Sequence, residues 1–235
     1  MSSHFWQDLL QALFPFHCLL CSNLSGWRQV LCPPCSEKIR QALFSPRRVT
    51  DVIGTLPSWT VGSYDGLLAQ AIKAAKYRPS RRMAQELGAL FELLVLRDDR
   101  FSWVDLVVPV PLHVAREGER GFNQARIFAE AVAKALNCPV CPAITRLRST
   151  RPQAECDENE RTRNLQGVFG LHPRLHQEVV RGKRVLLIDD VATTGHTLEE
   201  CTRPLRELPC ARVEALVLAH SFRRVPAAKP ILKEM

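Results

Sequence analysis

The stretch "VLLIDDVATTGHT", residues 185–197, decides the fold of this chain of 235 residues. Four apolar residues lead directly into two adjacent acids, Asp189 and Asp190, and a small, hydroxyl-rich loop with one glycine follows. The next residues, "HTLEECTRPLREL", have helical periodicity, although Pro204 is expected to kink or split that helix. The pattern predicts a buried strand, a loop and a helix, with both carboxylates at the carboxyl end of the strand.

Strand and helix patterns alternate along the rest of the chain. Strands are expected at residues 104–108 and in "RVEALVLAHS", and helices at residues 123–136 and on either side of Arg78-Pro79-Ser80. Residues 45–60 are rich in Pro, Gly, Ser and Thr and are interpreted as a linker that enters a strand. This alternation predicts an α/β fold with a mostly parallel sheet flanked by helices.

The loop from Ala192 to Thr197 has the chemistry of an anion site. The backbone N–H groups and the dipole at the start of a helix favour an anion, threonine hydroxyls add donors, and Gly195 permits a tight turn. In open α/β sheets, ligands bind beyond the carboxyl ends of the strands. A ribose 5-phosphate therefore fits, with its hydroxyls on the two acids and its phosphate on the loop.

Other sites built on acids or glycines fit the stretch less well. The chain has neither G-x-x-x-x-G-K-[ST] nor G-x-G-x-x-G. If Asp190 began an EF-hand, Ala192, Thr194 and Cys201 would stand at ligand positions, so calcium is not expected. Only 45 residues follow Asp190, too few for a phospho-acceptor receiver domain. A strand–helix turn with an aspartate cap explains one acid and one threonine, but not the whole block.

The cysteines form two knuckles near the N-terminus. Ten residues separate Cys18-x₂-Cys21 from Cys32-x₂-Cys35, a spacing that indicates a structural, tetrahedral Zn²⁺ site, with reactive or buried thiols as the alternative. A third pair, at residues 138 and 141, is interpreted as packing, and a second metal site is the alternative.

Composition sets only broad limits on function. The chain is 46% hydrophobic and 24% charged, as globular proteins are, and its formal net charge of +8 suits anionic partners. No run approaches ~18 apolar residues, so no membrane span is expected. Residues 5–14 are expected to form a short amphipathic helix rather than a signal peptide, and the protein is predicted to be cytoplasmic.

The opening stretch closely resembles the signature of type I phosphoribosyltransferases, which bind phosphoribosyl pyrophosphate (PRPP). Two further blocks, "PVPLHVAREGERGFNQA" and "TRPQAECDENERTRNLQGVF", and the four-cysteine module resemble the ComF/GntX family of competence-associated proteins. The resemblance covers roughly residues 15–220. It implies a type I phosphoribosyltransferase-like fold at 51–222, a helix and small zinc-ribbon-like module at 1–50, and a tail at 223–235.

The resemblance also implies roles for individual residues. Asp189 and Asp190 would hold the ribose hydroxyls. The residues implied to hold the 5-phosphate are Ala192, Thr193, Thr194, Gly195, His196 and Thr197. The loop 109–113, with Val110 and Pro111, would cradle pyrophosphate, with Arg116 and Arg120 as bidentate partners.

Two other segments receive roles from the same resemblance. Residues 150–164 match a mobile hood that closes over the reaction centre, and its expected contacts are Arg151, Gln153, Arg161 and Arg163. A basic block at the end of a helix would face pyrophosphate or nucleic acid, or lie on a solvated face; it comprises Lys73, Lys76, Tyr77 and Arg78.

The function that the resemblance implies is Mg²⁺-dependent transfer of a phosphoribosyl group to an unidentified acceptor, with release of pyrophosphate, in association with DNA uptake and utilisation. The implied metals are structural Zn²⁺ and Mg²⁺ that binds with PRPP. The alternative is a non-catalytic PRPP-binding module that binds single-stranded DNA or a protein of the competence machinery during transformation. A transcriptional regulator is a third interpretation. No base-recognition segment identifies an acceptor.

Overall fold

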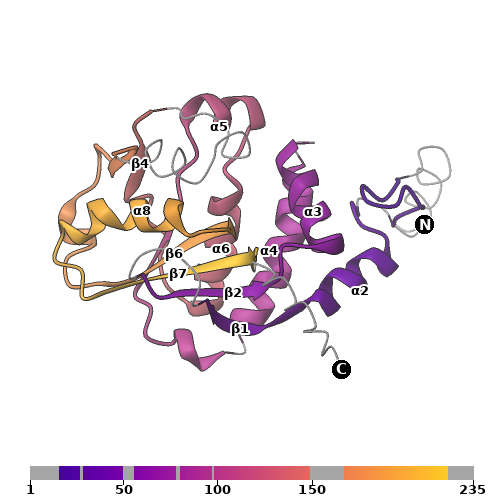
Figure 1. Ribbon diagram of the computed structural model, residues 1–235, viewed down its shortest axis with the longest axis horizontal. Coiled ribbons are helices and arrows are strands. Elements are labelled where there is room, and N and C mark those ends of the chain that lie inside the picture. The colour runs from indigo at the N-terminus through magenta and orange to yellow at the C-terminus, as the bar shows by residue number, and fades with distance from the viewer. Residues whose placement is uncertain are drawn as a thin grey trace, which may run out of the picture.

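The computed structural model describes residues 16–26, 29–49, 56–77, 80–96, 98–148 and 167–221. Its centre is a five-stranded sheet in the order β1-β2-β7-β6-β3 (Figure 1). The strands are β1 (Leu43–Val49), β2 (Ser58–Gly62), β3 (Leu106–Pro109), β6 (Arg184–Ala192) and β7 (Arg212–His220). Only the edge pair β1–β2 is antiparallel, and the other three pairs are parallel. The predicted mostly parallel sheet is confirmed.

Helices and one small hairpin surround this sheet. The α-helices are α2 (Pro33–Ala42), α3 (Gly66–Tyr77), α4 (Arg81–Leu96), α5 (Val114–Arg120), α6 (Gln124–Leu136) and α8 (His196–Arg206). Two short 3₁₀ helices are η1 (Asp99–Phe101) and η3 (Gln177–Val179), and β4 (Ile144–Arg146) pairs antiparallel with β5 (Phe169–Leu171). No helix that the structure describes is both long and apolar enough to cross a membrane.

The sheet separates two apolar cores, and β6 contributes to both. Leu186 and Ile188 pack with α3, α4 and α6, whereas Val185 and Leu187 pack with α8 and the β4–β5 hairpin. Side chains alternate between the two faces of a strand. The adjacent acids at the end of β6 therefore point toward opposite faces of the sheet.

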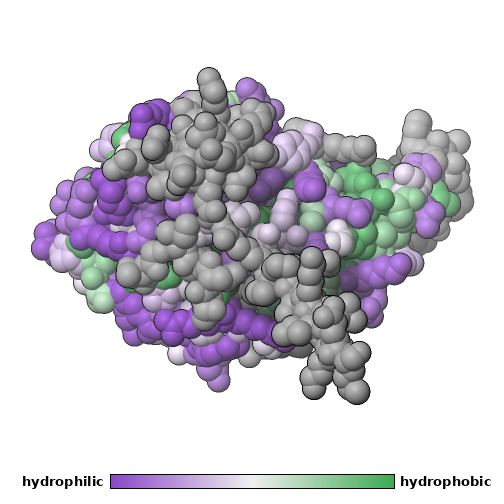
Figure 2. Space-filling model, viewed as in Figure 1, coloured by the Kyte–Doolittle hydropathy of each residue, from purple (hydrophilic) through white to green (hydrophobic). Residues whose placement is uncertain are grey.

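The cysteine-containing segment shares the first of these cores. Cys18, Cys32 and Ile39 belong to the same buried cluster as Leu68 and Ile72 of α3. Figure 2 shows apolar side chains gathered between α3 and this segment, whereas the opposite end of the visible face is mainly hydrophilic. The segment is therefore packed into the main domain rather than suspended from it.

Most of the helices agree with the sequence predictions. α3 and α4 end and begin on either side of residues 78–80, and Asn123 caps α6 by accepting the N–H of Ala125 at 3.0 Å. The strand expected at residues 104–108 forms as β3 (Leu106–Pro109).

One expectation about elements was wrong. Residues 45–49 belong to β1 rather than to a linker; Pro46 fits there because β1 is an edge strand with an irregular register between Leu43 and Arg47. α8 includes Pro204, two residues before its end, and is not split there. Arg116 and Arg120, for which no element was predicted, lie on a helix, α5. The predicted N-terminal amphipathic helix, the hood and the tail from residue 223 lie outside the described residues.

Candidate functional site

The loop after β6 turns sharply into α8. Gly195 precedes the first residue of the helix with φ +83°, in the left-handed region that glycine adopts without strain. Its carbonyl oxygen accepts the N–H of Glu199 at 2.9 Å, which closes the first helical turn. The N–H groups of residues 196–198 precede this first bond of the helix and point, with the helix dipole, toward the loop, where they favour an anion.

The loop encloses a cavity of about 170 Å³. Tyr64 and Lys76, from the opposite side, complete its wall. The loop residues that line it are Val191, Ala192, Thr193, Thr194, Gly195, His196, Thr197 and Leu198. All six residues that the sequence assigned to phosphate binding are therefore gathered around one small polar cavity.

Lys76 and Asp190 form an ion pair at the edge of this cavity. The Lys76 ammonium lies 2.9 Å from Oδ1 and 2.8 Å from Oδ2 of Asp190, and the two side chains are 22% and 10% exposed. Burial acts to lower the pKa of Lys76, but the Asp190 charge outweighs it and the pKa is raised. One of the two predicted ribose ligands is thus already paired with a cation.

Asp189 lies on the other face of β6, in a different environment. Its Oδ1 accepts the backbone N–H of Asp190 at 2.8 Å. Burial first, and the Asp190 charge second, raise the pKa of Asp189 to about 7, against the opposing charges of Lys76 and Arg146. A large fraction of Asp189 is therefore protonated at neutral pH, so its carboxyl can donate as well as accept a hydrogen bond.

The predicted pyrophosphate loop is tied to β6 and α6. The N–H of Val110 donates to the carbonyl oxygen of Ile188 at 2.9 Å, and the Asn123 amide donates to the carbonyl oxygen of Val110 at 3.0 Å. Pro111 follows, half-buried. These bonds hold the loop beside the carboxyl end of β6.

The two arginines of α5 face the same region. Burial lowers the pKa of Arg120, the Asp190 charge opposes that shift, and the Arg116 charge adds to it. Arg116 also lowers the pKa of Arg146, behind the larger effect of burial. Arg120 therefore lies within electrostatic range of Asp190, and Arg116 within range of Arg120 and Arg146. Their pairing with pyrophosphate stays a prediction.

The four N-terminal cysteines come together as a cluster. Their sulfur atoms all lie within 4.8 Å of one another, and Cys18, Cys32 and Cys35 are buried. Four sulfurs at the usual Zn–S distance of about 2.3 Å would form a tetrahedron with edges of about 3.8 Å, so the cluster fits Zn²⁺. Burial opposes, but hydrogen bonds from the backbone together outweigh it and lower the pKa of Cys18 to about 6. Burial raises the pKa of Cys35 beside it, so the fit to Zn²⁺ rests on the positions of the sulfurs.

Comparison with known proteins places the chain in a family. The phosphoribosyl transferase domain model matches residues 123–232. DNA utilization protein YhgH of Escherichia coli (strain K12) is 30% identical over 213 residues, 87% of this chain and 90% of that protein. Competence protein F of Haemophilus influenzae is 27% identical over 227 residues, 88% of this chain and 98% of that protein. The chain belongs to the ComF family.

Among solved structures, adenine phosphoribosyltransferase from Saccharomyces cerevisiae is similar to this ComF-family chain. The sequences are 13% identical, the match covers 80% of this chain and 88% of that one, and the TM-score is 0.40. The parallel sheet, the flanking helices and the matching domain model give the ComF-family chain a type I phosphoribosyltransferase-like fold, with a four-cysteine cluster near its N-terminal end that is compatible with a zinc module.

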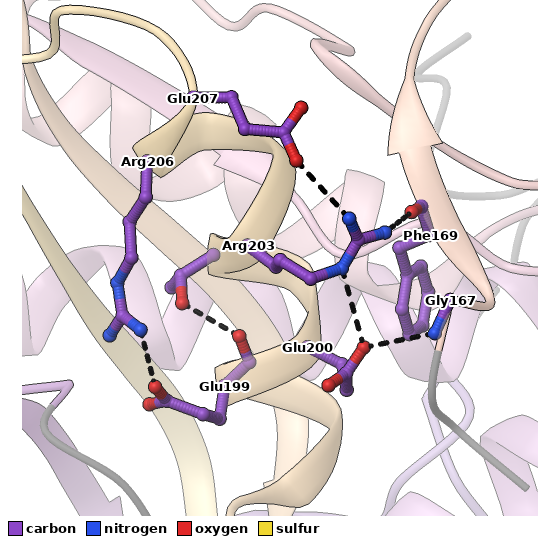
Figure 3. Close-up of polar contacts among 8 residues, drawn as sticks. Gly167, Phe169, Glu199, Glu200, Arg203, Arg206 and Glu207 are labelled. Carbon is purple, nitrogen blue, oxygen red and sulfur yellow. Dashed lines mark hydrogen bonds and ion pairs between the residues drawn. The ribbon is translucent and has the colours of Figure 1, made fainter.

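The β4–β5 hairpin is held against α8. Arg203 donates to the carbonyl oxygen of Phe169 at 2.7 Å, and Glu200 accepts the N–H of Gly167 at 3.3 Å (Figure 3). Arg203 also pairs with Glu200 and Glu207 on its own helix. The two ends of the predicted hood segment emerge from this hairpin. The hood residues Arg151, Gln153, Arg161 and Arg163 themselves lie outside the described residues.

Three further residues were not selected from the sequence of this ComF-family protein. Tyr64 lines the cavity, and Arg146 interacts electrostatically with Asp189. Gln124 is 1% exposed, and neither polar atom of its amide has a hydrogen-bond partner among the described residues. Arg146 and Gln124 stood within or beside family-like blocks, but only the three-dimensional structure shows what surrounds them.

Proposed function

We propose that this ComF-family protein binds PRPP and transfers its phosphoribosyl group to an acceptor. The observation that carries the proposal is the cavity at the start of α8, lined by all six predicted phosphate-binding residues and adjoined by Asp190. The site combines an anion pocket, acceptors for hydroxyl groups and two arginines, which are the three requirements of a sugar carrying phosphate at both ends.

Different residues of the site bind different parts of PRPP. The loop 192–197 binds the 5-phosphate, Asp189 and Asp190 bind the ribose hydroxyls, and Arg116 and Arg120 bind the pyrophosphate. Mg²⁺ bound together with the pyrophosphate would supply positive charge that neutralises the leaving group. As the bond to pyrophosphate breaks, positive charge develops on the ribose ring, and a carboxylate beside the ring stabilises it electrostatically.

The proposal is tested by calorimetric titration of the full chain with PRPP and Mg²⁺. Binding is expected for the wild-type protein and at least tenfold weaker binding for the D189N/D190N variant, because Asp190 loses its negative charge and each carboxyl exchanges an acceptor oxygen for an amide that donates. Unchanged affinity in that folded variant would remove the ribose assignment. Release of pyrophosphate in the presence of candidate acceptors then distinguishes an enzyme from a PRPP-binding module.

Single-stranded DNA is a second candidate ligand. Tyr77, at the end of α3, is 77% exposed and stands beside basic residues of the same helix. An exposed aromatic ring beside positive charge is what stacking of single-stranded bases uses, and the relatives' printed names refer to DNA utilization and competence. If DNA binds here, Y77A weakens binding of a single-stranded oligonucleotide and leaves PRPP affinity unchanged, and wild-type binding falls steeply with salt. If the partner is a protein rather than DNA, we propose a protein of the competence machinery.

A further inference from the structure

Lys76 belongs both to the phosphate cavity and to the ribose-binding acids. It lines the cavity together with Thr193, Thr194 and Gly195, and the same ammonium group contacts both carboxylate oxygens of Asp190. Lysine carries one flexible, compact charge with three donors. It can therefore serve Asp190 or a phosphate in the cavity as its main partner.

In the competition between Asp190 and a bound phosphate for Lys76, the phosphate has the advantage. A phosphate in the cavity has several acceptor oxygens and more negative charge than one carboxylate. The long lysine side chain keeps 22% exposure, so it is not locked in a closed core. Arg120 also feels the Asp190 charge, so Asp190 retains a cationic neighbour when Lys76 leaves it.

We propose that Lys76 is a phosphate-binding residue supplied by α3 to the loop 192–197, and that its exchange from Asp190 to the bound phosphate opens Asp190 to the ribose hydroxyls. This inference rests on the proposed function and deepens it, because it assigns an order to binding. The phosphate end binds first, and the sugar then gains its carboxylate. A sugar without a phosphate meets an acid that is already paired.

This mechanism predicts that loss of the Asp190 carboxylate increases the affinity for phosphate through Lys76, which a static ion pair does not predict. Replacing Asp190 by Asn releases Lys76 to the cavity, so the D190N variant is expected to bind inorganic phosphate at least about threefold more tightly. The K76M variant is expected to bind it at least about tenfold more weakly, because a charge-assisted contact is lost.

The experiment is a titration of the full chain and its variants with inorganic phosphate, followed by ribose 5-phosphate. The double variant D190N/K76M carries a neutral pair, so it avoids an unpaired buried carboxylate, and it is expected to lack the gain seen in D190N. At about pH 8, above the pKa of about 7 of Asp189, D189N is the matched control, because it then also removes one negative charge, but on the face of β6 opposite the Lys76–Asp190 ion pair. The gain in phosphate affinity of D189N is expected to be smaller than that of D190N.

The outcomes are distinguishable. Two pairs are compared: D190N with the wild type, and D190N/K76M with K76M. If both pairs show the same gain in phosphate affinity, Lys76 does not mediate the gain and the inference is overturned. Equal gains in D189N and D190N overturn it as well. If the wild-type protein binds neither phosphate compound nor PRPP, the proposed function itself fails. If it binds PRPP but K76M leaves phosphate affinity unchanged, only the role of Lys76 fails.

Discussion

At the scale of single residues, Asp189 and Asp190 are neighbours in sequence but lie in different electrostatic environments. Asp190 faces Lys76, whereas burial raises the pKa of Asp189 to about 7. Between the ordinary pKa of 3.8 and about 7, the folded protein binds more protons at Asp189 than the unfolded chain does. Stability from this residue is therefore lost as pH rises through that window.

Asp189→Asn removes this dependence. The melting temperature of D189N minus that of the wild type is expected to rise between about pH 5 and about pH 8, with D189N the more stable protein at the higher pH. Thermal denaturation at several pH values measures the difference. A difference that stays constant with pH would contradict the raised pKa.

Asp105 provides a control of opposite sign. Arg184 holds the pKa of Asp105 well below its usual range through side-chain and backbone hydrogen bonds. Stability from Asp105 is present above its ordinary pKa and is lost as the pH falls toward the depressed value. Asp105→Asn should therefore lower the melting temperature at neutral pH, the opposite of the change expected for D189N.

Gln124 has a buried amide that is expected to cost stability. Its amide is buried without a partner among the described residues, and such a group costs about 1–3 kcal/mol. Gln124→Met keeps the length of the side chain and removes the polar atoms, so the free energy of unfolding is expected to rise by about 1 kcal/mol. Chemical denaturation measures it, with the exposed Gln70→Met as the near-neutral control. A loss of stability in Q124M would show that the amide has a partner in solution.

At the scale of elements, the strand–loop–helix unit was predictable because its signals are local. The apolar run, the acids and Gly195 are consecutive in sequence, and they form β6, the loop and the start of α8. β1 was not predictable as part of the sheet, because its edge position tolerates Pro46 and only its pairing with β2 reveals it. α5 was missed because seven residues, none of them buried, leave no apolar periodicity to read.

The anchoring of the β4–β5 hairpin on α8 has its own test. Arg203 bonds the carbonyl oxygen of Phe169, whereas Arg206 pairs with Glu199 on its own helix (Figure 3). Arg203→Met should speed amide hydrogen exchange in β5 by about tenfold, because a charge-assisted hydrogen bond of about 1.5 kcal/mol is lost. Arg206→Met, one turn away on the same helix, should leave that exchange unchanged. Equal exchange in the two variants would mean that the bond from Arg203 does not hold the hairpin, which would leave its apolar contacts and the bond from Gly167 to Glu200.

At the scale of the whole molecule, the sequence predicted which residues meet but not how they are paired. The phosphate loop and the four cysteines assemble as their spacing indicated. Lys76 and Asp190 are 114 residues apart, and no local pattern couples them. The same limit holds for the cysteine segment, whose integration into the core around α3 depends on contacts that are distant in sequence.

That integration predicts how the protein responds to loss of zinc. Cys18, Cys32 and Ile39 pack in one core with Leu68 and Ile72 of α3, and the N–H of Val30 donates to Glu86 of α4 at 3.1 Å. Metal that binds only the folded state stabilises everything that folds with it. Cys18→Ser with Cys32→Ser should therefore remove one zinc per chain and lower the melting temperature of the whole domain in a single transition.

The pair Cys138→Ser and Cys141→Ser is the matched control. These two residues pack against the two apolar cores, so their replacement should retain the zinc measured by atomic emission. Calorimetry measures whether the cysteine segment and the main domain unfold in one transition or in two. If the C18S/C32S protein showed an unchanged main transition after losing its zinc, the cysteine segment would be an independent appendage. A lowered main transition would instead mean that the metal supports α3, and through α3 the position of Lys76 beside the phosphate loop.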